Sequence, residues 1–113
     1  MNDVKIIRAR DLRSRYQELT REYTQKGLQY TSMQICEIIS KEPAPRFYLL
    51  ESYAKNKMYA IRNGCIQTTR QLKDLYRIYR RTGDIRAAIA TPAPSSYLSP
   101  IRIYRILIDT IRL

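Results

Sequence analysis

The stretch PAPRFYLL, residues 43–50, returns forty-nine residues later as PAPSSYLS, residues 92–99. Five of the first seven positions are identical: Pro, Ala and Pro, then Tyr and Leu. The prolines restrict the backbone and end any helix that precedes them. We therefore expect each copy to be a rigid connection between two helices, in which the shared Tyr and Leu anchor the next helix in the core.

Helical patterns surround both copies of this phrase. Residues 10–27 carry a stripe of apolar side chains at spacings of four, three and four, and Gly27 is placed as a left-handed C-cap. Capping-box patterns, Thr followed three residues later by Gln, begin at Thr31 and Thr68. Ser99 followed by Pro is typical of the start of a last helix. Further helices are expected over residues 35–42, 51–63, 70–83 and 84–90.

The order of these elements is the same in both halves of the chain. Each half has an amphipathic helix ending in Gly, a shorter helix, PAPxxYL and another helix. When Gly27 is aligned with Gly83, Leu19 meets Leu75, Arg21 meets Arg77 and Tyr23 meets Tyr79. The sequence therefore predicts an all-α fold of five to six helices. We expect one compact domain, residues 1–113, made of two tandem helix–PAPxxYL–helix units at residues 8–64 and 69–113.

The charge of the chain favours an anionic partner. There are 21 Lys and Arg residues against 10 Asp and Glu residues, which gives a net charge of +11. Such a field attracts nucleic acid, acidic protein surfaces or lipid headgroups. Ten Tyr accompany the arginines, and Tyr and Arg are the residues enriched at the energetic centres of interfaces.

Several classes of protein are disfavoured by what the sequence lacks. Without any His, a Cys/His zinc site is impossible and a Cys nucleophile has no His base. The three Gly residues fall at helix ends, so no glycine-rich loop is available for a phosphate. We expect no enzymatic activity, no metal and no cofactor. The basic N-terminus does not resemble a signal peptide, and the charged side chains of residues 101–113 argue against a membrane span.

The two cysteines, Cys36 and Cys65, do not have the spacing of a metal site. We expect two buried thiols in an intracellular protein, with a single disulfide as the alternative.

A basic stripe is predicted on the helix at residues 70–83. At 100° per residue, its cations fall within an arc of about 100°. The opposite arc holds Leu72, Leu75, Tyr76 and Tyr79. The stripe can lie along phosphates, or it can be a solvated face whose arginines pair with acidic residues. Its members are Arg70, Lys73, Arg77, Arg80 and Arg81.

The first copy of the phrase has its own candidate contact residues. Arg46 and Phe47 stand where the second copy has Ser95 and Ser96. They are therefore free to contact a base, a phosphate or a partner protein. The alternative is that Phe47 fills a larger core in the first half.

The helices on either side of PAPRFYLL also allow a helix-turn-helix interpretation. The recognition helix would be residues 51–63, with its polar side chains turned outward. The connection is longer than the usual three or four residues, which counts against this arrangement. The outward residues would be Lys55, Asn56, Lys57 and Arg62.

Two stretches carry a family resemblance. ICEIISKEPAPRFYLLESYAKNKMY, residues 35–59, and LKDLYRIYRR, residues 72–81, resemble a group of small, uncharacterised basic proteins of tailed bacteriophages and of mobile elements in gut bacteria. Those proteins share an APRFY-type phrase between helices and a later basic helix with Tyr and Arg. The resemblance implies a phage or mobile-element context and assigns no role to single residues.

These observations lead to two hypotheses. The first is a non-enzymatic structural or assembly protein, a small phage virion component that bridges larger proteins and contacts acidic surfaces or DNA phosphates. The second is a helix-turn-helix-like DNA-binding regulator or accessory protein of a phage or mobile element. Either would act in the virion or the bacterial host cytoplasm, with no membrane partner, and a homo-oligomer is left open. A regulator should prefer one duplex sequence, whereas an assembly protein should bind DNA without sequence preference and with strong salt dependence.

Overall fold

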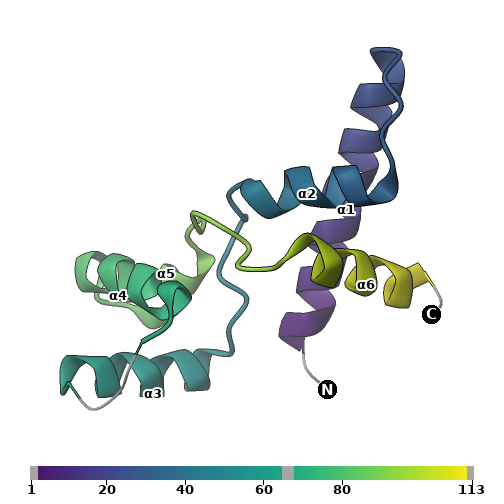
Figure 1. Cartoon of the computed structure of the whole chain (residues 1–113). Coiled ribbons are helices and arrows are strands. Elements are labelled where there is room, and N and C mark those ends of the chain that lie inside the picture. Colours follow the sequence, from purple (N-terminus) through teal and green to yellow (C-terminus); the bar gives the residue numbers. More distant parts are fainter. Residues whose placement is uncertain (1–2, 65–67, 112–113) are drawn as a thin grey trace. The chain divides into compact units, whose positions relative to one another are not determined.

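The structure is a computed structural model that describes residues 3–64 and 68–111, with side chains up to Asp109. Within these residues it is all-helical and has no strand, which confirms the predicted fold class (Figure 1). Cys65 lies outside the described residues. The helices are α1 (Asp3–Gln25), α2 (Ser32–Lys41), α3 (Glu51–Arg62), α4 (Arg70–Thr82), α5 (Ile85–Ala90) and α6 (Pro100–Ile111).

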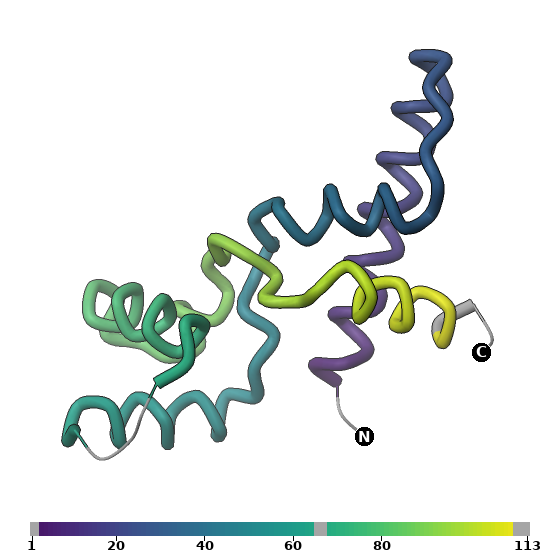
Figure 2. The backbone as a smooth tube through the Cα atoms, viewed as in Figure 1, coloured from purple at the N-terminus to yellow at the C-terminus, as the bar shows by residue number. Residues whose placement is uncertain are grey.

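The chain forms two compact units rather than one. Unit 1 takes in the described parts of Met1–Glu42 and Ser95–Leu113, and unit 2 is Pro43–Pro94. Helices α1, α2 and α6 pack on one another in unit 1, and α3, α4 and α5 do so in unit 2, as the chain trace illustrates (Figure 2). Each unit therefore joins two helices from one half of the sequence to the last helix of the other half. The boundaries differ from the expected segments 8–64 and 69–113, and the internal repeat stays a prediction.

The two copies of PAPxxYL pair through their alanines. The Ala44 N–H donates to the Ala93 carbonyl at 3.0 Å, and the Ala93 N–H donates to the Ala44 carbonyl at 2.9 Å. Both alanines are buried. From residue 42 to 50 and from 91 to 99, buried, half-buried and exposed side chains follow one another in the same order. The small Ala side chain lets the two backbones approach, so the phrase serves as a backbone contact as well as a helix connection.

The anchoring side chains differ from the expectation. Tyr48 and Leu49 are only half-buried, as are their counterparts in the second copy. The deepest side chain of the first copy is Phe47, which is 1% exposed. Its N–H donates to the Ile89 carbonyl at 2.9 Å, which fixes the residue against the end of α5. Phe47 therefore belongs to the core of unit 2, as the second interpretation of this residue had it.

Unit 1 is held by an apolar core between its three helices. An ion pair joins α1 to the C-cap of α2: the Arg15 guanidinium donates to the two Glu42 carboxylate oxygens at 2.9 and 2.7 Å. These hydrogen bonds raise the pKa of Arg15 above its ordinary value. The buried Cys36 is a free thiol, and desolvation raises its pKa. The core residues are Leu12, Leu19, Ile35, Cys36, Ile39, Ile103 and Leu107.

Unit 2 has its own core, which determines the orientation of α4. Thr69 caps the N-terminus of the helix, one residue later than the expected cap at Thr68, and its hydroxyl accepts the Leu72 N–H at 3.3 Å. Gly83 caps the C-terminus with a φ of 70°, which favours glycine. The buried apolar side chains of the three helices are Ala54, Met58, Leu72, Leu75, Ile78, Ile85 and Ala88, and Asp74 is buried as well.

Candidate anion-binding surface on unit 2

Unit 2 carries more of the net positive charge than unit 1. Between Pro43 and Pro94 there are ten Lys and Arg residues and three Asp and Glu residues, a net charge of +7. The rest of the chain has eleven and seven, a net charge of +4. The field that attracts an anion is therefore strongest around α3, α4 and α5.

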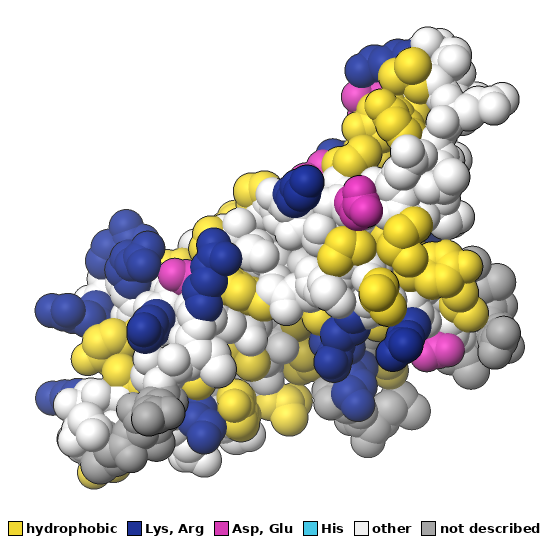
Figure 3. All heavy atoms as spheres, viewed as in Figure 1, with side chains coloured by type: hydrophobic (Ala, Val, Ile, Leu, Met, Phe, Trp, Pro, Cys, Tyr) yellow, Lys and Arg dark blue, Asp and Glu magenta, His cyan; other side chains and the backbone are white. Residues whose placement is uncertain are grey.

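Helix α4 presents a cationic face opposite its buried face. The buried residues of α4 are Leu72, Asp74, Leu75 and Ile78. Basic side chains gather on the molecular surface over α4 and α5 (Figure 3). We call the following set the α4 cationic face; every member is exposed, as the helical spacing predicts: Arg70, Lys73, Arg77, Arg80 and Arg81.

Most of this face lacks an acidic partner. Arg77 Nη2 lies 3.2 Å from Asp74 Oδ1. No other member of the face forms an ion pair with any residue in 3–64 or 68–111. The Arg77 side chain is 71% exposed, whereas that of Asp74 is only 11% exposed, so Arg77 meets a largely buried carboxylate and still faces solvent. All five cations are thus accessible to an external anion.

Tyr76 lies on the cationic face, in contrast to its expected position in the core. Its side chain is half-buried, and the Arg80 guanidinium carbon is 5.9 Å from the ring centroid. These two residues line a surface depression of about 500 Å³ together with Lys73, Arg77 and Arg81. The helical spacing placed Tyr76 with the apolar residues opposite the cations. Its ring lies at the edge of that apolar arc, where it also reaches the cations.

A second depression lies on α3 and α4. Tyr59 of α3 lines it and is 70% exposed. Lys55 and Arg62 are exposed on the same helix and line this groove, as the sequence placed them outward. Lys57 instead lies over the Tyr53 ring, with its Nζ 5.4 Å from the centroid. The lining residues are Lys55, Asn56, Met58, Tyr59, Arg62 and Tyr79.

The remaining candidates fall away from this surface. Arg46 is half-buried in the connection before α3. Phe47 is buried and is not accessible to a partner, so its inclusion among the contact residues was wrong. Helices α2 and α3 belong to different units, and α3 packs on α4 and α5.

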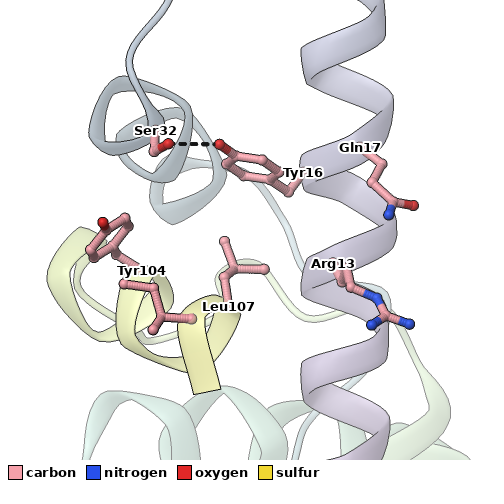
Figure 4. Close-up of a pocket in the computed structure, with 7 residues that line it drawn as sticks. Arg13, Tyr16, Gln17, Ser32, Tyr104 and Leu107 are labelled. Carbon is pink, nitrogen blue, oxygen red and sulfur yellow. Dashed lines mark hydrogen bonds between the residues drawn. The ribbon is translucent and has the colours of Figure 1, made fainter. Parts of the chain in front are cut away.

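Unit 1 contains an apolar pocket of about 300 Å³ between its helices. In it, Tyr16 points from α1 toward Ser32 on α2, and the Tyr16 hydroxyl donates to the Ser32 hydroxyl at 2.9 Å (Figure 4). The Tyr16 hydroxyl is thus engaged within the protein, and the other polar side chains of the lining are those of Arg13, Gln17 and Tyr104. Its lining residues are Arg13, Tyr16, Gln17, Ser32, Tyr104, Leu107 and Ile108.

No group of three potential metal ligands occurs in the described part of the chain. None of the helices in residues 3–64 and 68–111 combines the length and apolar character that a membrane span requires.

No family model matches this chain, and no match is found among curated proteins or solved structures. The basis for a function is therefore the surface chemistry of unit 2.

Proposed function

We propose that the protein is a non-enzymatic structural or assembly component, such as a small virion protein of a tailed phage, which contacts DNA through unit 2. The observation that carries this proposal is the α4 cationic face, in which only Arg77 is paired among the described residues. Phosphates match it chemically, because an Arg guanidinium can hold two phosphate oxygens at once while the helix backbone stays rigid.

Two features favour an assembly role over a sequence-reading regulator. Contacts from Lys and Arg to phosphates fix position but read no sequence, and α2 and α3 lie in different units. Two separately cored units also offer two surfaces on one chain, which suits a bridging protein. Exposed apolar side chains of unit 1, such as Leu28 and Ile101, are available for partner proteins. The resemblance to phage proteins supports the same context.

A salt titration of DNA binding tests this proposal. The full-length protein is compared with a triple variant, Arg77→Gln, Arg80→Gln and Arg81→Gln, on a short random-sequence duplex. The slope of log affinity against log salt should become shallower by up to three contacts, at about 0.9 per contact. Gln keeps helix propensity, so circular dichroism should show equal helicity.

A matched control removes the same charge from unit 1. Arg21, Arg102 and Arg105 are exposed, and their triple replacement with Gln should leave the slope close to that of the wild type. An equal change in both triple variants would make binding a general effect of net charge. An unchanged slope in the α4 variant would contradict the proposal.

A further inference from the structure

Tyrosine rings and cations alternate on α3 and α4 of unit 2. The α4 depression places Tyr76 among Lys73, Arg77, Arg80 and Arg81, and the neighbouring groove places Tyr59 and Tyr79 beside Lys55 and Arg62. Tyr76 and Tyr79 are three residues apart on α4, so they are neighbours on its surface. The two depressions therefore adjoin along α4.

Tyr59 is the ring in this surface with the most solvent-accessible area. It is 70% exposed, while the buried positions of α3 are Ala54 and Met58. Lys55 and Arg62 stand four residues before and three residues after Tyr59, so all three side chains lie on one face of α3. Tyr59 thus presents a ring to solvent between two cations. A planar ligand that carries negative charge is complementary to this arrangement.

Single-stranded nucleic acid has this combination of groups. Its unpaired bases expose flat faces that stack on aromatic side chains, and its phosphates follow a basic groove. In a duplex the base faces are already stacked on one another, so no base face is available to stack on a tyrosine ring. Cations alone fit either form, whereas an exposed Tyr between two cations fits the single strand.

We propose that unit 2 binds single-stranded nucleic acid, with Tyr59 as a stacking platform for a base and the α4 cationic face in contact with phosphates. This inference rests on the proposed function and specifies its ligand. In the α4 depression the Arg80 guanidinium covers the Tyr76 ring, so this pair presents a planar cation rather than a free ring. Tyr59 is therefore the decisive residue.

The test compares three probes at one salt concentration: an oligothymidylate, an oligouridylate and a random-sequence DNA duplex of equal length. The full-length protein should bind a single strand more tightly than the duplex, and tighter binding of either single strand supports the proposal. Tyr59→Ala should weaken single-strand binding by about five- to a hundredfold, the range for loss of one base–aromatic contact. It should leave duplex binding unchanged. Tyr59→Phe should keep most of the affinity because its ring still stacks.

Control variants separate this inference from the proposed function. Tyr30→Ala removes an exposed tyrosine of unit 1 and should leave binding unaltered. Equal binding of duplex and single strands, with no loss in Tyr59→Ala, overturns the stacking inference. In that case a reduced salt slope in the α4 triple variant still upholds the proposed function. Binding to polyglutamate but to neither form of nucleic acid overturns both.

Discussion

At the scale of single residues, the difference between the two PAPxxYL copies is a difference in core volume. Phe47 is buried in unit 2, and the residue at its position in the second copy, Ser96, is buried in unit 1. Seven residues further on, the sizes are reversed: Ala54 is buried in unit 2, and Ile103 is buried in unit 1. A large residue in each unit is thus accompanied by a small one, as close packing requires.

Phe47 is expected to be the residue of the first phrase on which stability depends most. Phe47→Ala should lower the free energy of unfolding by about 3–5 kcal/mol, because it deletes a fully buried ring and leaves a cavity. Urea denaturation followed by circular dichroism measures this change. The adjacent Arg46→Ala serves as the control and should cost less than about 1 kcal/mol. Equal losses in the two variants would contradict the burial of Phe47.

At the scale of helices, the sequence predicted best where the signals are local. The capping box forms as expected, with the Gln34 N–H donating to the Thr31 hydroxyl and the Gln34 amide oxygen accepting from the Thr31 N–H. The Gly27 cap also forms: its N–H donates to the Thr24 carbonyl, and the Leu28 N–H donates to the Tyr23 carbonyl. Each of these bonds spans only a few residues, so the sequence between the partners specifies it.

Helix starts without a distinctive cap were predicted less well. Helix α1 begins at Asp3 rather than at residue 10, because residues 3–9 have no regular apolar stripe that would reveal the helix. Thr68 and Thr69 are adjacent, and either can offer a hydroxyl three residues before an N–H, so the cap was expected at Thr68 and lies at Thr69, although α4 itself begins at residue 70 as predicted. The cationic side of α4 was predicted correctly from the helical period. The accessible Tyr59 was missed because exposure depends on which helices pack together.

The C-terminal end of α4 offers a prediction about backbone conformation. Gly83 has a φ of 70°, and no neighbouring atom lies within 4 Å of where a Cβ would be added. Gly83→Ala should therefore destabilise through the left-handed backbone alone, by about 1–2 kcal/mol. Gly83→Asn should cost less, because Asn tolerates this region better than Ala. Urea denaturation of the two variants tests the ranking, and a more stable Ala variant would refute it.

At the scale of the whole molecule, the pairing of helices was beyond sequence reasoning. An amphipathic sequence indicates that a helix buries one face, but it does not specify which helices cover that face. The sequence order suggested that each half packs on itself, whereas α6 packs on α1 and α2, and α3 packs on α4 and α5. The reciprocal hydrogen bonds of Ala44 and Ala93 occur at equivalent positions of the two phrases. If the sequence is a duplication, as we predict, the two units have exchanged their third helices.

This exchange predicts the behaviour of a cut chain. A protease site inserted between Gly64 and Thr68 divides the protein into one fragment with α1, α2 and α3 and another with α4, α5 and α6. Unit 1 needs α6 from the second fragment, and unit 2 needs α3 from the first. The cleaved protein should therefore elute from a sizing column with the mass of the intact chain, keep its circular dichroism and separate only in denaturant.

A core variant checks that the exchanged helices hold the fragments together. Met58 and Leu107 are buried on α3 and α6, at positions whose replacement by Asp would place an unpaired charge in each core. The double variant Met58→Asp and Leu107→Asp should lose the association after cleavage, whereas the exposed pair Lys55→Asp and Arg102→Asp should retain it. Fragments of the wild-type sequence that separate into two compact, helical species would instead show that each half folds on itself. The tandem segments 8–64 and 69–113 would then be the folding units.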